Sequence, residues 1–291
     1  MPLPRALVGL LLCSAAASAQ QVEPLIARPI TLPRGAVDLT LHGTYTNWTI
    51  GGTPGADPGE TLALGVDFGA TDRVQLGLAM AFPINPGAAF GSILGNATFA
   101  MGKELALRLD GGYERFALNG GSSISIDRYF GGLGARIKIP LSPSVAFVSG
   151  RAGAVHFGHF NNLGEAGFGL YEGASFLTEL SSDFLVLSAG SNDSPTRLGI
   201  NLPLGVLFQP DPHFALTLLA GYSAVIDFPH TGSSATAHFL PIGLEVVGTP
   251  VPWLDIGARF LVDGFVAQSS GSSNTGYLDF RTLMLWFRFG V

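Results

Sequence analysis

Apolar side chains alternate with small or polar ones along most of the chain after residue 36, and no other pattern in the sequence limits the fold as strongly. Successive side chains of a β-strand point to opposite faces, whereas a helix would spread the two sets around its circumference. The pattern therefore predicts strands with two unlike faces. In the clearest run, Arg197 to Phe208, the apolar face consists of Leu198, Ile200, Leu202, Leu204, Val206 and Phe208.

Twelve such segments follow one another, and the connections between them alternate in length. Tight turns such as Thr71-Asp72 and Gly102-Lys103 alternate with longer connections rich in Gly, Ser, Asn and Pro, the longest of which is 158–196. This order predicts an up-and-down antiparallel meander with all its tight turns at one end. The segments span about 36–50, 60–71, 73–83, 91–102, 104–117, 124–139, 144–157, 197–209, 213–226, 237–248, 253–264 and 277–291.

Composition separates a soluble β-sandwich from a membrane barrel. Hydrophobic residues make up 47% of the chain and charged residues only 12%, yet after residue 20 no apolar stretch reaches the roughly 18 to 20 residues of a spanning helix. A sandwich needs a well-charged outer face, but the second face here is mostly Gly, Ala, Ser and isolated charges. With the apolar face turned to lipid, the fold is predicted to be all-β: a transmembrane up-and-down antiparallel β-barrel of about 12 strands, with short periplasmic turns and long extracellular loops.

The first 19 residues have the layout of a secretory signal peptide. Arg5 precedes an apolar core from Ala6 to Leu12, and Ala17-Ser18-Ala19 forms an A-x-A cleavage site. A lipoprotein signal ending at Cys13 is the alternative, but Leu12 stands where a small residue is expected. We therefore expect cleavage after Ala19, a short periplasmic segment at 20–35, and a barrel at 36–291.

The C-terminal strand has an unbroken apolar face formed by Leu283, Leu285, Phe287, Phe289 and Val291. This end resembles the closing strand of bacterial outer-membrane β-barrel proteins, although that group usually ends in Phe and this chain ends in Val291. The resemblance implies a place in the outer membrane of a Gram-negative bacterium, contact with its lipids, and recognition by the barrel-insertion machinery. Aromatic residues near strand ends, among them Trp253 and Trp286, fit the interfacial girdles of such barrels.

Charged residues on the second face are expected to line the lumen, because a cation facing lipid at membrane depth costs about 2 to 4 kcal/mol. They suit either a polar conduit for a small solute or a set of salt bridges that closes the barrel, since twelve strands lie between a filled eight-stranded barrel and an open porin. The candidates are Asp67, Arg108, Asp110, Glu114, Arg136, Lys138, Arg151, Asn201, Glu245, Asp255, Arg259 and Asp263.

The connection 158–196 is far longer than ordinary loops, and loops of that size usually carry function or structure of their own. We interpret it as a segment that caps or constricts the barrel mouth. The alternative is two further strands, which would give 14 in total.

The residues favour transport over catalysis. No Ser-containing nucleophile motif is present, and the closely spaced His156 and His159 would lie on opposite faces of a strand, so we expect no enzyme, metal or cofactor. A net charge of −6 without a Lys/Arg cluster excludes nucleic acid as a partner. The sequence thus predicts a porin-like channel or small-solute transporter gated by 158–196, with a closed structural or adhesion barrel as the alternative.

Overall fold

The computed structural model describes residues 21–50, 53–54, 59–85, 92–118, 124–149, 183–190, 196–228, 235–262, 267–269 and 278–290. All regular structure in these ranges is β-strand, and every strand pairing is antiparallel. The strands are β1 Val37–Ile50, β2 Thr53–Pro54, β3 Gly59–Thr71, β4 Val74–Asn85, β5 Ser92–Ala100, β6 Leu105–Leu118, β7 Ile124–Ser142, β8 Val145–Ser149, β9 Asp183–Gly190, β10 Thr196–Asp211, β11 Phe214–Phe228, β12 Ala235–Phe239, β13 Ile242–Val251, β14 Leu254–Val262, β15 Ala267–Ser269 and β16 Leu278–Gly290.

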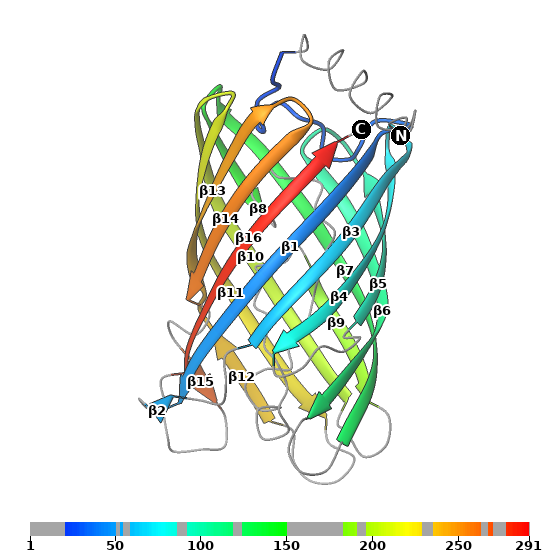
Figure 1. Cartoon of the computed structure of the whole chain (residues 1–291), viewed down its shortest axis with the longest axis vertical. Helices are drawn as coiled ribbons and strands as arrows, with labels where there is room; N and C mark the ends of the chain where they lie inside the picture. The colour runs from blue at the N-terminus through cyan, green and yellow to red at the C-terminus, as the bar shows by residue number, and fades with distance from the viewer. Residues whose placement is uncertain are drawn as a thin grey trace, which may run out of the picture.

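The sheet closes on itself because β1 pairs with both β3 and β16, and because β10 pairs with β11 (Figure 1). Some wall positions are formed by two strands that lie end to end. β8 and β9 both pair with β7 and β10, and β12 and β13 both pair with β11. The described residues thus form a closed barrel of twelve wall positions. The twelve-strand prediction is confirmed.

The seventh wall position differs from its prediction in one respect. The sequence pattern placed one strand at 144–157 and a loop at 158–196, whereas the structure builds this position from β8 and, further along the chain, β9. The fourteen-strand alternative is therefore wrong, because β9 completes a position that β8 begins. Residues 150–182 and 191–195 lie outside the described residues, and so does most of the predicted cap.

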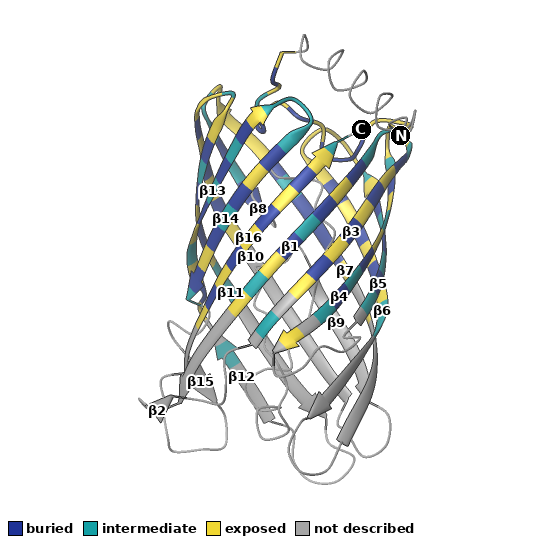
Figure 2. Ribbon diagram, in the orientation of Figure 1, coloured by how far each residue is buried: buried dark blue, intermediate teal, exposed yellow. Residues whose placement is uncertain are grey.

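The two faces of the wall alternate as the sequence pattern requires (Figure 2). The outward parity exposes large apolar side chains, for example Leu64, Leu109, Val206 and Leu285, the last of which is 54% exposed. The inward parity buries small and polar residues. An apolar belt of this extent suits lipid rather than water. Among the described residues, no helix is long and apolar enough to cross a membrane.

The tight turns gather at one end of the barrel, where the last strand also ends (Figure 1). They include Asp72-Arg73 between β3 and β4, residues 101–104 between β5 and β6, and Pro143-Ser144 between β7 and β8. Short turns mark the periplasmic end of outer-membrane barrels, so we call this end the periplasmic mouth.

Candidate functional site

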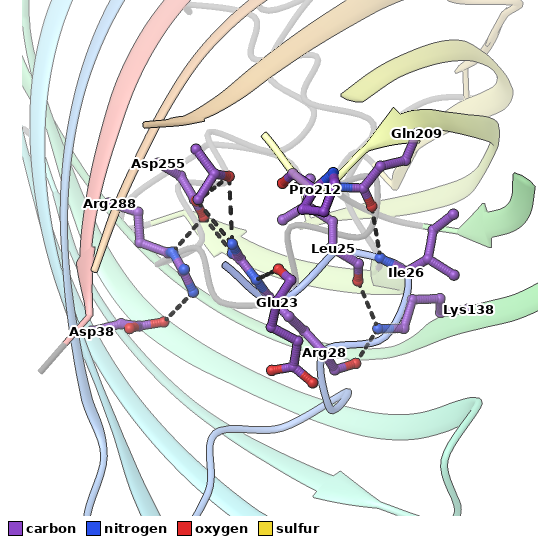
Figure 3. A network of polar contacts seen from close by, with 11 residues as sticks. Glu23, Leu25, Ile26, Arg28, Asp38, Lys138, Gln209, Pro212, Asp255 and Arg288 are labelled. Atoms are coloured by element: carbon purple, nitrogen blue, oxygen red, sulfur yellow. Dashed lines mark hydrogen bonds and ion pairs between the residues drawn. The ribbon is translucent and has the colours of Figure 1, made fainter. Parts of the chain in front are cut away.

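Residues 21–35, which we call the plug, enter the periplasmic mouth and pack inside the barrel (Figure 3). Its Val, Leu and Ile side chains are at most 7% exposed although they belong to no strand. The sequence interpretation assigned 20–35 to a short periplasmic segment and did not foresee this insertion. The buried apolar residues are Val22, Leu25, Ile26, Ile30 and Leu32.

A tight turn shapes the first half of the plug. The carbonyl of Pro24 accepts hydrogen bonds from the backbone N–H groups of Ala27, at 2.9 Å, and Arg28, at 3.1 Å. This turn directs Leu25 and Ile26 into one apolar cluster on the wall from β8 to β16, so the plug is seated by hydrophobic burial on that side. The wall members of the cluster are Ala146, Val148, Leu207, Ala215, Val247, Met284 and Trp286.

Arg28 anchors the plug through a buried ionic chain (Figure 3). Its guanidinium binds both carboxylate oxygens of Asp255 on β14, Nη1 to Oδ2 at 2.6 Å and Nη2 to Oδ1 at 3.1 Å. Arg288 on β16 lies between the two wall carboxylates, with Nε 2.8 Å from Oδ2 of Asp255 and Nη1 3.2 Å from Oδ2 of Asp38 on β1. The chain thus crosses the pair of strands that closes the barrel.

Neutral contacts fix the geometry around this chain. The Thr249 hydroxyl donates to Oδ1 of Asp255 at 2.7 Å, and Nε of Arg28 donates to the carbonyl of Glu23 at 3.2 Å. The bidentate contact between the Arg28 guanidinium and the Asp255 carboxylate fixes the orientation of both groups as well as pairing their charges.

Two further wall residues bind the plug backbone. The Lys138 ammonium on β7 donates to the carbonyls of Leu25, at 3.1 Å, and Arg28. Oε1 of Gln209 on β10 accepts from the N–H of Ile26 at 3.1 Å, while its Nε2 donates to the carbonyl of Pro212 at 3.4 Å. These side chains satisfy polar backbone groups that would otherwise be buried without partners.

The second half of the plug is held by the hairpin of β3 and β4. Leu32 N–H donates to Gln75 Oε1 at 3.1 Å, and Arg34 N–H donates to the Asp72 carboxylate at 3.0 Å. Gly35, with a φ of 81° that favours glycine, donates to the carbonyl of Gly69 at 2.8 Å. A side chain at Gly69 would overlap the carbonyl of Pro33, so the chains can approach only because this residue is glycine.

A cavity of about 590 Å³ separates the plug from the opposite wall. Residues 26–31 of the plug form one side, and the turns at 72–73 and 100–104 with Lys138 and Pro140 form the other. Its charged lining residues are Arg28, Arg73, Lys103, Lys138, Asp72 and Glu104. Ile30 packs on Ala106 of β6 beside this cavity, so the plug contacts the wall on that side as well and leaves a cavity next to the contact.

Many of the predicted lumen residues are buried against the interior. Arg108 binds Asp110, two residues along the same strand, at 2.6 Å, and Arg259 binds Glu245 on the neighbouring strand at 2.9 Å. The side chains of Glu114 and Asn201 are outside the description although their backbones lie in strands, and Arg151, Asp263 and Val291 are outside the described residues. The buried members of the predicted set are Asp67, Arg108, Asp110, Arg136, Lys138, Glu245, Asp255 and Arg259.

The sequence reasoning missed several residues that hold the plug. Asp38 and Arg288 lie on the inward parity of their strands, so the alternation rule could have found both. Trp286 obeys the same rule: it is 1% exposed inside the barrel, where Gly257 leaves room for its indole, and its assignment to an interfacial girdle is wrong. Arg28, in contrast, has no local signal.

Comparison with known proteins places the fold. No known protein family and no curated protein matches the sequence. The structure of an outer membrane channel from Pseudomonas putida F1 matches with a TM-score of 0.55 and 12% identity, over 93% of this chain and 100% of that chain. The chain folds as a bacterial outer-membrane β-barrel.

Two further solved barrels match with lower TM-scores. The translocator domain of autotransporter NalP from Neisseria meningitidis matches with a TM-score of 0.46 and 12% identity, over 98% of this chain and 96% of that chain. The NanC porin matches with a TM-score of 0.44 and 8% identity, over 86% of this chain and 98% of that chain. A shared fold does not fix function, so the function of the barrel has to be argued from its own residues.

The described part of the barrel shows no group of three or more His, Cys, Asp or Glu placed to hold a metal ion. His156 and His159 lie outside the described residues. The candidate site of the barrel is therefore the plug with the wall residues that bind it.

Proposed function

We propose that the protein is an outer-membrane channel for a small solute and that the plug closes its periplasmic mouth at rest. The observation that carries this proposal is the origin of the obstruction: the segment in the periplasmic mouth belongs to no strand and is held there by side chains of the wall. A segment docked by side chains can leave without unfolding the barrel. The proposed gate is thus the plug, whereas the sequence analysis predicted that residues 158–196 gate the channel.

The lumenal ion pairs support an open interior. Arg108 and Asp110 lie on one strand, and Glu245 and Arg259 lie directly opposite each other on β13 and β14. Both pairs run along the wall and do not span the lumen. The plug itself spans the mouth, because it binds wall residues on β7, β10 and β14. Without the plug, a twelve-stranded barrel encloses more space than an eight-stranded one, whose interior side chains fill.

Single-channel recording in planar bilayers tests the proposal. Deletion of residues 22–30 from the full chain should raise the conductance several-fold, because it removes the apolar and ionic obstruction together. Arg34→Met is the matched control: it changes an exposed plug residue whose side chain is not the anchor and should leave the current as in the wild type. If the deletion variant folds, as heat-modifiable gel mobility would show, and carries no more current than the wild type, the channel proposal is wrong.

A closed structural or adhesion barrel is the second candidate, and the dense anchoring of the plug favours it. Residues 24–35 bind the wall from β3 and β4 to β16 through backbone, side-chain and apolar contacts. Under this alternative the plug stiffens the barrel, and its removal lowers thermal stability without opening a path. The same recordings separate the two.

We also propose that the barrel is not an enzyme. We further propose that its outer face binds two partners, the outer-membrane lipids and the barrel-insertion machinery. Outer-membrane lipids contact the exposed apolar belt, and the insertion machinery binds the C-terminal strand, where Leu283, Leu285, Phe287 and Phe289 all point outward. Replacing Phe287 and Phe289 with Ala should slow insertion into lipid vesicles by the purified machinery, whereas Leu109→Ala, a likewise exposed change on β6, which does not pair with β16, should not.

A further inference from the structure

The first half of the plug occupies a site whose chemistry can be read from what it binds. Leu25 and Ile26 lie on an apolar floor, and Arg28 reaches an acidic group at its edge. We infer that this is a binding site for an organic cation with a short apolar body, and that the plug fills it in place of that ligand. The inference rests on the proposed channel, for which such a cation is the solute that releases the plug.

The apolar floor under Leu25 and Ile26 consists of side chains that belong to the wall strands and not to the plug. Ala146, Val148, Leu207 and Val247 are each at most 1% exposed, and they come from β8, β10 and β13. When the plug leaves, these side chains face the lumen. An apolar molecule of similar size would cover them again, which is favourable for the same reason that Leu25 and Ile26 bind there.

The acidic edge requires a cation. Without Arg28, Asp255 loses the guanidinium that binds both of its oxygens, and Arg288 is shared between Asp255 and Asp38. Asp255 is fully buried when the plug is docked, and a buried unpaired charge is strongly unfavourable. A bound anion would place a further negative charge beside the Asp255 carboxylate, and a neutral molecule would not replace the lost ion pair.

The geometry selects the form of the cation. Arg28 uses two nitrogens on the two oxygens of Asp255, and Nη2 also lies 3.4 Å from the Thr249 hydroxyl. A planar guanidinium or amidinium reproduces both contacts, whereas an ammonium is a point charge without the fork. Because one turn of chain joins Leu25 to Arg28, a molecule with only a few carbons between its apolar part and its cationic head can span both.

The charges around the site agree with this choice. Lys138 on β7 donates to the carbonyls of Leu25 and Arg28, so its ammonium lies on the backbone side of the plug, whereas the Asp255 carboxylate lies at the Arg28 head. Glu23 contributes its carbonyl to Arg28. The groups bound to the Arg28 head are therefore acceptors or acids.

Butylguanidinium is a suitable probe, with butylurea as its neutral isostere and butyrate as its anionic counterpart. Trp286 reports on the site because it belongs to the same apolar cluster as Leu25. In full-length protein carrying Trp48→Phe and Trp253→Phe, butylguanidinium should change the Trp286 emission saturably. Butylurea should bind at least tenfold more weakly, and butyrate should give no saturable change.

Substitutions on both sides of the contact complete the test. Arg28→Ala removes the competing head and should tighten butylguanidinium binding at least tenfold, whereas Asp255→Asn should weaken it at least tenfold. Arg28→Gln, which keeps a polar side chain, serves if Arg28→Ala fails to fold. Equal affinity for butylguanidinium and butylurea, or an affinity that neither substitution changes, would overturn the inference.

Electrical recordings keep this inference distinct from the proposed function. Current through the plug-deleted barrel without butylguanidinium binding to the Arg28 variants overturns the binding site and leaves the channel standing. Selective binding without current in any variant overturns the channel as well as the solute role, and leaves only a cation site. Both results together, with butylguanidinium raising the open probability of the wild type, support the full proposal.

Discussion

The two halves of the plug are attached to the barrel in different ways. Residues 24–28 are held by wall side chains, namely the carboxylate of Asp255, the ammonium of Lys138 and the amide of Gln209. Residues 31–35 are held, without an ion pair among the described residues, by the β3–β4 hairpin, where the N–H groups of Leu32 and Arg34 bind the side chains of Gln75 and Asp72 and the N–H of Gly35 binds the carbonyl of Gly69. Two attachments of unlike chemistry thus lie within one short segment.

This difference indicates which half can move. The hydrogen bonds of residues 31–35 to the described part of the wall come from this one hairpin and none is part of the ionic chain, so we expect residues 31–35 to stay attached when the first half leaves. The first half depends on charges that a ligand can replace and on an apolar floor that a ligand can cover. Pro29 and Ile30 lie between the halves, so the release of residues 22–28 leaves the plug tethered at the mouth.

The largest effect is expected from Asp255→Asn, which removes the anion that Arg28 and Arg288 share. Breaking a buried ion pair by removing one partner costs about 3 to 5 kcal/mol. The first half of the plug should detach, with a red shift of Trp286 emission in the Trp48→Phe, Trp253→Phe background and a higher conductance. An unshifted emission maximum in folded protein would show that the apolar contacts alone hold this half.

Leu25→Ala should have the next largest effect, because Leu25 is 1% exposed within the apolar cluster. Truncating a buried Leu costs about 2 to 5 kcal/mol. The plug should dock more weakly while Arg28 keeps its partners, so butylguanidinium should release it at a lower concentration than in the wild type. A titration midpoint equal to that of the wild type would contradict a role for the floor in docking.

The wall could be predicted from sequence because each strand records its own orientation. Parity alone turned Glu245, Asp255 and Arg259 inward, because successive residues of a strand face opposite sides. By the same rule Leu283, Leu285, Phe287 and Phe289 face outward. The plug could not be predicted in this way. Residues 21–35 have no periodicity, and their burial depends on partners such as Asp255, 227 positions away from Arg28. Likewise, β9 joins β8 only through pairing with β7 and β10, which no local pattern records.

Gly69→Ala should separate the two halves of the plug. The added methyl group overlaps the carbonyl of Pro33, and inserting a methyl group into a packed contact costs about 1 to 3 kcal/mol. The effect should be confined to residues 31–35: a cysteine introduced at Leu32 should become reactive to a maleimide, while Trp286 emission stays unchanged. A simultaneous shift of that emission would mean that the halves detach together.

Arg34→Met should have the smallest effect and gives the sharpest comparison with Arg28→Met. Both substitutions remove one arginine charge from the plug, but the Arg34 side chain is exposed and the residue binds Asp72 through its backbone N–H. An exposed substitution of this kind changes the free energy by less than about 0.5 kcal/mol. Arg28→Met should shift Trp286 emission and raise the conductance, and Arg34→Met should do neither. Equal shifts in the two variants would mean that the total charge of the plug, rather than the contact between Arg28 and Asp255, holds it in the barrel.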